Sequence, residues 1–155
     1  MNLFSLLDQA ARHFPENPAV CVGTDCLLRY AELRSRASSL AAVLHRRYRT
    51  GDRIAIVSEN RPEYVELLFG LWAAGLVAVP INAKLHPREV AQIVDDAQAA
   101  AVFVAPALVR RYKGALPVQD SGPQGFPSFR RFPGAVFAGG DIIDGPSEPP
   151  FREAP

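Results

Sequence analysis

The stretch Asn60–Asn82 (NRPEYVELLFGLWAAGLVAVPIN) constrains the fold of this chain more than any other segment. Asn60 and Glu63 have the spacing of a capping box, and Pro62 falls in the first helical turn, where its missing N–H costs nothing. An apolar helical surface and a glycine stop follow, and then a strand is predicted over Leu76–Ile81. A helix that leads into a buried strand is one half of a parallel-sheet unit.

The rest of the first two thirds of the chain shows the same alternation of periods. Apolar residues at helical spacing predict helices over Leu3–Phe14, Leu33–Leu44 and Pro87–Ala97. Short apolar runs predict strands over Pro18–Val22, Leu27–Tyr30, Arg53–Val57 and Ala100–Ala105. From residue 53 onward the order is strand, helix, strand, helix, strand, and the strands are nearly continuous in apolar residues. This order predicts an α/β fold with a partial, Rossmann-like βαβ parallel sheet, right-handed crossovers and helices on both faces.

The character of the sequence changes after Ala105. Residues 106–155 hold nine of the 14 prolines and seven of the 11 glycines, a share that predicts an irregular or disordered tail. Val136–Ala138 and Ile142–Ile143 are candidate short strands inside it. We therefore divide the chain into a patterned domain, residues 1–105, and an irregular Pro/Gly-rich tail, residues 106–155. The abrupt change in composition indicates a shifted reading frame, a truncated product or a divergent tail.

Charge and hydropathy exclude several classes of partner. The formal net charge is +1, which gives no general attraction to nucleic acid, and the arginine pairs lack interleaved aromatic residues. The first 14 residues have no basic leader, and no apolar run is long enough to span a bilayer. We therefore expect a cytoplasmic protein without nucleic-acid or membrane partners.

Cys21 and Cys26 are the only cysteines, and they flank a predicted hairpin turn, Val22–Asp25. A disulfide between them is geometrically open. Two reduced thiols on adjacent strands are the favoured interpretation for a chain without a secretory signal.

Motifs for phosphate, metal or nucleophilic chemistry are missing from the sequence. Neither a G-x-G-x-x-G nor a Walker loop occurs, and Ser121–Gly125, the nearest approach to an anion loop, has no lysine. The three histidines (His13, His45, His86) stand far apart, and Asp95–Asp96 is most simply a solvated pair. No catalytic or metal-binding residue is therefore predicted.

Lys84 is the basic residue with the best claim to a function. It follows the predicted strand Leu76–Ile81, and ligands gather at the carboxyl ends of strands in open parallel sheets. A phosphate contact and a plain solvated lysine are both open interpretations.

Five segments, taken together, resemble the N-terminal region of AMP-forming acyl-CoA synthetases, members of the adenylate-forming superfamily. The segments are Leu3–Pro18 (LFSLLDQAARHFPENP), Leu28–Arg34 (LRYAELR), Gly51–Asn60 (GDRIAIVSEN), Pro62–Phe69 (PEYVELLF) and Ala74–Pro80 (AGLVAVP). Each is a weak pattern alone, but their order and spacing over residues 2–105 make the resemblance specific. It implies that the chain is an N-terminal subdomain of such an enzyme.

The resemblance also implies a chemistry, a ligase reaction of fatty acid metabolism. A carboxylate reacts with Mg·ATP to give an acyl-adenylate, and coenzyme A then forms the thioester. In the family, the phosphate loop and the catalytic lysine lie downstream of the matched region, so we expect an inactive fragment that needs no cofactor by itself. Lys84 matches a position that in some members touches the coenzyme phosphates. The alternative is a non-catalytic interaction module, which would be a homo-oligomer or one half of a split ligase.

Two positions depart from the family pattern. Arg29 and His86 stand where the family usually has Thr or Ser as helix caps. Losing each hydroxyl cap is expected to cost about 1 kcal/mol without forbidding the fold.

Overall fold

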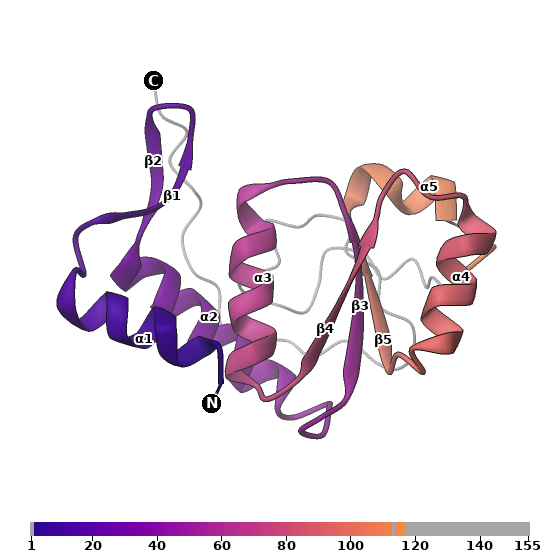
Figure 1. Ribbon diagram of the computed structural model, residues 1–155, viewed down its shortest axis with the longest axis horizontal. Helices are drawn as coiled ribbons and strands as arrows, with labels where there is room; N and C mark the ends of the chain where they lie inside the picture. The colour runs from indigo at the N-terminus through magenta and orange to yellow at the C-terminus, as the bar shows by residue number, and fades with distance from the viewer. Residues whose placement is uncertain (1, 113, 117–155) are drawn as a thin grey trace.

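The computed structural model describes residues 2–112 and 114–116, and Figure 1 shows their arrangement. The helices are α1 (Phe4–His13), α2 (Tyr30–Leu44), α3 (Pro62–Ala73), α4 (Pro87–Asp96) and α5 (Val109–Tyr112), with a 3-10 turn, η1 (Pro106–Leu108), before α5. The strands are β1 (Pro18–Val22), β2 (Asp25–Arg29), β3 (Arg53–Ser58), β4 (Val77–Asn82) and β5 (Ala101–Val104). Every helix and strand predicted up to residue 105 is present. The candidate strands at 136–138 and 142–143 and the loop at 121–125 lie outside the described residues.

The central sheet is parallel and has the strand order β4-β3-β5. Ile56 of β3 is in register with Pro80 on one side and Phe103 on the other. The chain therefore passes from the middle strand to one edge and then crosses to the opposite edge. The predicted parallel sheet is confirmed.

Alternate residues of β3 face two separate apolar clusters, because successive side chains of a strand point to opposite faces. Ile54 and Ile56 pack with α3 and the second half of α2. Ala55 and Val57 pack with α4 and α5. Figure 1 shows α3 and α4 on opposite sides of the sheet. The prediction that helices cover both faces is therefore confirmed.

A third apolar cluster joins the β1–β2 hairpin to α1 and α2. Its buried members are Leu7, Val20, Leu28, Leu33 and Ala37. Helix α2 contributes its first half to this cluster and its second half to the sheet, so it belongs to both. Its contact with α3 is close: a Cβ added to Gly70 would lie 2.7 Å from Cγ of Leu40, which is 1% exposed.

Two groups of charged side chains connect these helices. Asp8 of α1 accepts hydrogen bonds from Arg34 (2.6 Å) and Arg12 (2.9 Å). The hydrogen bond from Arg34 is the main reason why the pKa of Asp8 lies below its ordinary value. Between α2 and α3, an oxygen of Glu66 lies 3.6 Å from the Arg36 guanidinium, and Glu66 is 7% exposed.

The predicted capping box at Asn60 and Glu63 is wrong. The N-cap of α3 is Arg61, which has an extended backbone (φ −139°, ψ 151°) and makes no side-chain cap. The proline at position 62 disfavours helical geometry in the residue before it, which moves the helix start one residue later. Oε2 of Glu63 is buried without a hydrogen bond and lies 3.5 Å from Nε of Arg61.

The two family departures have different outcomes. At His86 the loss of the cap was wrongly expected, because Nδ1 of the imidazole accepts a hydrogen bond from the Arg88 N–H (3.2 Å). The Glu89 carboxylate completes this box by accepting from the His86 N–H (2.8 Å). At Arg29 the backbone N–H still donates to Glu32 (2.8 Å), but a guanidinium has no acceptor atom and cannot replace a hydroxyl.

The fold continues past residue 105. Leu108, Tyr112 and Leu116 are buried in the cluster that contains α4. They stand four residues apart along the chain, although only Tyr112 lies within α5, and the prolines and glycines around them hide this spacing. The packed structure therefore extends at least to Leu116, and a boundary between domain and tail stays a prediction.

Candidate functional site

The carboxyl edge of the sheet is the candidate site. Ser58 ends β3 and Asn82 ends β4, and these two residues are in register. The chain after β3 leads to α3 on one face of the sheet, whereas the chain after β4 leads to α4 on the other. Open parallel sheets bind their ligands outside the carboxyl ends of their strands, so this edge is where a ligand is expected.

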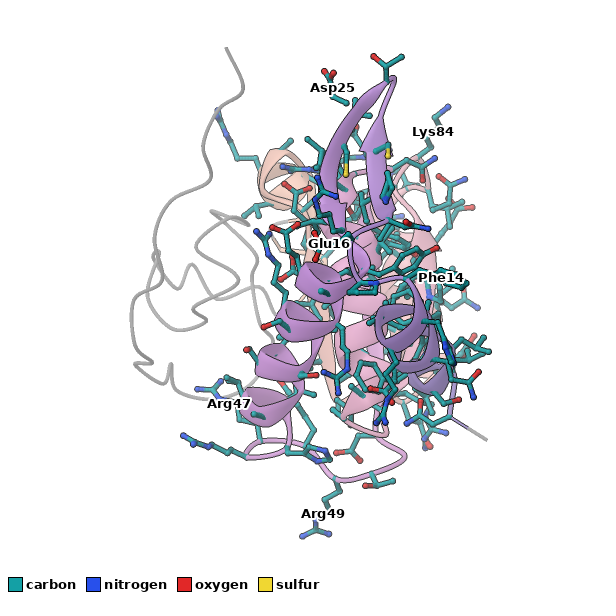
Figure 2. The ribbon with its side chains drawn as sticks, turned by 90° about the vertical axis from the view of Figure 1, so that its left-hand side faces the viewer. Phe14, Glu16, Asp25, Arg47, Arg49 and Lys84 are labelled. Atoms are coloured by element: carbon teal, nitrogen blue, oxygen red, sulfur yellow. The ribbon has the colours of Figure 1, made fainter. Side chains whose placement is uncertain are left out.

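Lys84 lies in the loop that leaves β4 at this edge. Asn82 Oδ1 accepts a hydrogen bond from the Lys84 backbone N–H (2.9 Å), and the Asn82 carbonyl accepts from the Leu85 N–H (3.1 Å). The loop is therefore a tight turn. The Lys84 side chain is exposed, and Figure 2 shows it pointing away from the body, at the same end as Asp25 of the hairpin.

Two residues of α5 hold the backbone of this loop, and we refer to them as the Arg111–Tyr112 clamp. The Tyr112 hydroxyl lies 3.0 Å from the carbonyl oxygen of Ala83 and 3.1 Å from that of Leu85. The Arg111 guanidinium donates to the carbonyls of Ala83, Lys84 and Leu85 at 3.0–3.2 Å. The guanidinium also lies 5.7 Å from the centroid of the Tyr112 ring. The clamp fixes the backbone from which the Lys84 side chain projects.

The clamp was not predicted, because Arg111 and Tyr112 fall within residues 106–155, which were predicted to be an irregular tail. Arg111 is exposed, as expected of a solvated arginine, but all the hydrogen bonds of its guanidinium given above go to main-chain carbonyls. The helical spacing of Tyr112 with Leu108 and Leu116 was the available signal.

The other candidate residues do not assemble into a site. Among residues 2–112 and 114–116, no three His, Cys, Asp or Glu side chains come close enough together to hold a metal ion. The three histidines lie on separate elements: His13 ends α1, His45 follows α2 and His86 caps α4. In the same part of the chain, no helix has the length and apolar character needed to cross a membrane.

The residues at the sheet edge do not fit Mg·ATP. A triphosphate site needs several backbone N–H groups in a glycine-rich loop, usually with a lysine. None of the segments that follow the three strands at this edge (residues 59–61, 83–86 and 105) contains a glycine. One exposed lysine fits a different task, because an ammonium group binds a phosphate as a point charge.

Known protein sequences are similar to most of this chain. The family described as AMP-binding enzyme matches residues 7–127, which extends beyond the 2–105 of the expected resemblance. A long-chain-fatty-acid–CoA ligase of Haemophilus influenzae is 32% identical over 105 residues, which are 66% of this chain and 18% of that protein. A feruloyl-CoA synthase of Amycolatopsis is 35% identical over 130 residues, which are 76% of this chain and 26% of that protein. The chain thus spans about a fifth to a quarter of the length of these relatives.

Solved structures show the same region. The N-terminal subdomain of NpsA from Klebsiella oxytoca superposes with a TM-score of 0.62 at 28% identity, covering 66% of this chain and 27% of that one. A fatty acyl CoA synthetase of Mycobacterium tuberculosis gives a TM-score of 0.60 at 35% identity, covering 65% and 20% of the two chains. The chain therefore belongs to the AMP-binding enzyme family, and its fold matches part of the N-terminal subdomain of adenylate-forming enzymes.

Proposed function

We propose that these residues form the N-terminal structural segment of an AMP-forming acyl-CoA ligase, in which Lys84 contacts the phosphates of coenzyme A. The main support is the position of Lys84 on a clamped loop at the carboxyl edge of the sheet. The similarity to the CoA ligases of Haemophilus influenzae and Amycolatopsis supports the reaction class. In such a ligase, ATP converts a carboxylate into an acyl-adenylate, and the thiol of coenzyme A displaces AMP.

In this proposal Lys84 binds and orients, and it takes no part in bond making. Its ammonium pairs with phosphate oxygens while the clamp keeps its backbone in place. An exposed pair of this kind contributes about 1 kcal/mol, or roughly a fivefold change in Kd. Lys84→Arg keeps the charge and Lys84→Ala removes it, so the pair of variants isolates the charge.

The test uses a chimera in which residues 2–116, which include the clamp, replace the matching segment of the Haemophilus influenzae ligase. We expect Lys84→Ala to raise KM for coenzyme A about fivefold and to leave KM for ATP unchanged. Arg49→Ala removes an exposed cation at the opposite end of the molecule (Figure 2) and should change neither. Equal effects of Lys84→Ala and Arg49→Ala on KM for coenzyme A would refute the proposed contact.

We further propose that the 155 residues do not adenylate a carboxylate by themselves. None of the segments that follow the three strands at the described sheet edge has the glycines of a triphosphate cradle. The measurement is carboxylate-dependent exchange between ATP and pyrophosphate, with a fatty acid and with ferulate as substrates. Exchange that copurifies with the chain through two different columns would contradict this proposal.

A second candidate function is a non-catalytic module that pairs with a complementary ligase segment or with its own copy. The supporting observation is apolar exposure: Leu6, Phe14 and Val77 are 55%, 57% and 46% exposed, and Val77 lies on the edge strand β4. Large exposed apolar side chains favour association. Light scattering after size exclusion over a range of concentrations tests the homo-oligomer, and co-expression with the remaining segment of a relative tests the split ligase. A monomer that captures no such segment would exclude this function.

A further inference from the structure

The two cysteines occupy directly opposite positions of the β1–β2 hairpin. The loop between the strands is Gly23–Thr24, and Val22 and Asp25 are the pair that closes it. Gly23 has φ +59°, which suits the first central position of a type II′ turn. Cys21 and Cys26 form the next pair along the ladder.

This position is geometrically suited to a disulfide. In a two-residue hairpin the pair that closes the turn is hydrogen-bonded, so the next pair is a non-hydrogen-bonded one, with side chains on one face and Cα atoms about 4.5 Å apart. Disulfides require Cα separations of about 4.4–6.8 Å. Cys21 and Cys26 therefore meet the requirement without a change in strand register.

The two thiols are reduced, exposed and close enough to influence each other. Both are free cysteines on the protein surface. The surrounding protein atoms, and then the Cys26 thiol, raise the pKa of Cys21 above its ordinary value. Figure 1 shows the hairpin extending away from the helices, which leaves it open to small reagents.

We propose that Cys21 and Cys26 are a redox-active dithiol, which closes to an intramolecular disulfide by exchange with a low-molecular-weight disulfide of the glutathione type. One protein thiolate attacks the small disulfide, forms a mixed disulfide and releases one small thiol. The second protein thiolate attacks the protein sulfur of that mixed disulfide and releases the other small thiol. The protein loses two electrons, the small disulfide gains them, and the two protons of the protein thiols end on the two released thiols. This proposal is independent of the ligase function.

The hairpin gives the second step its advantage. The paired strands hold the second thiol beside the first, so its attack on the mixed disulfide is intramolecular. The protein disulfide therefore forms in place of a lasting mixed disulfide with glutathione. A flexible chain would have to bring the two thiols together against its conformational entropy.

The experiment oxidises the reduced 155-residue chain with glutathione disulfide and follows one tryptic peptide. Residues 13–29 contain both cysteines and no internal Lys or Arg. We expect this peptide to lose two hydrogen atoms, to resist alkylation and to carry no glutathione, and dithiothreitol should restore both thiols. A peptide with two glutathione adducts, or a disulfide-linked dimer of the chain, would overturn the proposal.

Two controls separate the hairpin from sequence proximity. Cys21→Ser and Cys26→Ser each keep one thiol and should end as stable glutathione adducts. The wild-type equilibrium with the glutathione couple is then measured in buffer and in denaturant. We expect the disulfide to be favoured at least about tenfold more in the folded chain. Equal equilibrium constants in the two solvents would refute the role of the hairpin.

Discussion

The Arg111–Tyr112 clamp allows a quantitative prediction about unfolding. The Tyr112 hydroxyl has one hydrogen atom, so its contacts with the carbonyls of Ala83 and Leu85 count as a single shared hydrogen bond. Tyr112→Phe keeps the buried ring and its contact with Arg111. Both carbonyls also keep donors, because Arg111 still binds them. We therefore expect Tyr112→Phe to lower the free energy of unfolding by about 1 kcal/mol.

Removal of Arg111 alone should have a similar cost. In Arg111→Ala the Tyr112 hydroxyl still serves one of the two carbonyls, and the loss comprises exposed hydrogen bonds and the cation–π contact, about 1 kcal/mol in all. The double variant combines Arg111→Ala with Tyr112→Phe. In it the carbonyl of Ala83, a buried residue, loses both side-chain donors. An unsatisfied buried acceptor costs about 1–3 kcal/mol. The double variant should therefore lose about 3 kcal/mol, roughly 1 kcal/mol more than the sum of the single variants.

The assay is urea unfolding of the four proteins, followed by far-ultraviolet circular dichroism, with a common m-value as the check for two-state behaviour. A coupling energy is obtained from the resulting double-mutant cycle. If the single effects add to within about 0.3 kcal/mol, the two side chains do not share the carbonyls, and the clamp is refuted.

Three further changes test other parts of the fold. Gly70→Ala gains about 1 kcal/mol of helix propensity but drives a methyl group into the buried Leu40, so we expect a net loss of about 1–3 kcal/mol in urea unfolding. Leu40→Ala leaves a cavity and is destabilising by itself, but it should cost less beside Gly70→Ala than in the wild-type chain, because the added methyl group fills part of that cavity, and equal costs in the two backgrounds would contradict the contact. Arg36→Ala removes the cation that lies 3.6 Å from the buried Glu66 carboxylate, and it should cost about 2 kcal/mol, more than Glu66→Gln. The reverse order in the unfolding free energies would contradict the pairing. The pKa of Asp8 is lower in the folded chain than the ordinary value of about 3.9, so the stability that Asp8 contributes is present above that pH and is lost as the pH falls through the folded pKa. Asp8→Asn should therefore make the free energy of unfolding fall less steeply with acid, and parallel curves of unfolding free energy against pH for the two proteins would refute this.

The sheet was predictable because each of its strands is a nearly continuous run of apolar residues. The run Ile54–Val57 is almost fully buried, and a continuous apolar run reports burial on both faces without any tertiary information. The helix end at Gly75 was equally readable, since its φ of +69° is a conformation that glycine adopts without strain. These signals are local, so the sequence contains them in full.

The missed features depend on residues that are distant in the sequence. Tyr112 forms a hydrogen bond with Ala83, and Arg36 forms an ion pair with Glu66. The partners are too far apart in the sequence for the spacing of apolar residues to reveal these contacts. The wrong prediction of a capping box at Asn60 has a local cause. The spacing of Asn60 and Glu63 favours a helix that begins at Asn60, but Pro62 disfavours helical geometry at Arg61, and this restriction decides the helix start. At the candidate site, the sequence placed Lys84 on the correct edge but showed nothing of the clamp beneath its loop.

Helix α2 belongs to two apolar clusters at once, and this has a consequence for how the molecule opens. Leu33 and Ala37 pack under the hairpin, while Leu40 and Leu44 pack against the sheet. A helix that unwinds in one half removes support from both neighbours, so hairpin and sheet should open together as one cooperative unit. Amide protons of β1 and β3 would then exchange with solvent deuterium at similar free energies, although the two strands share no ladder.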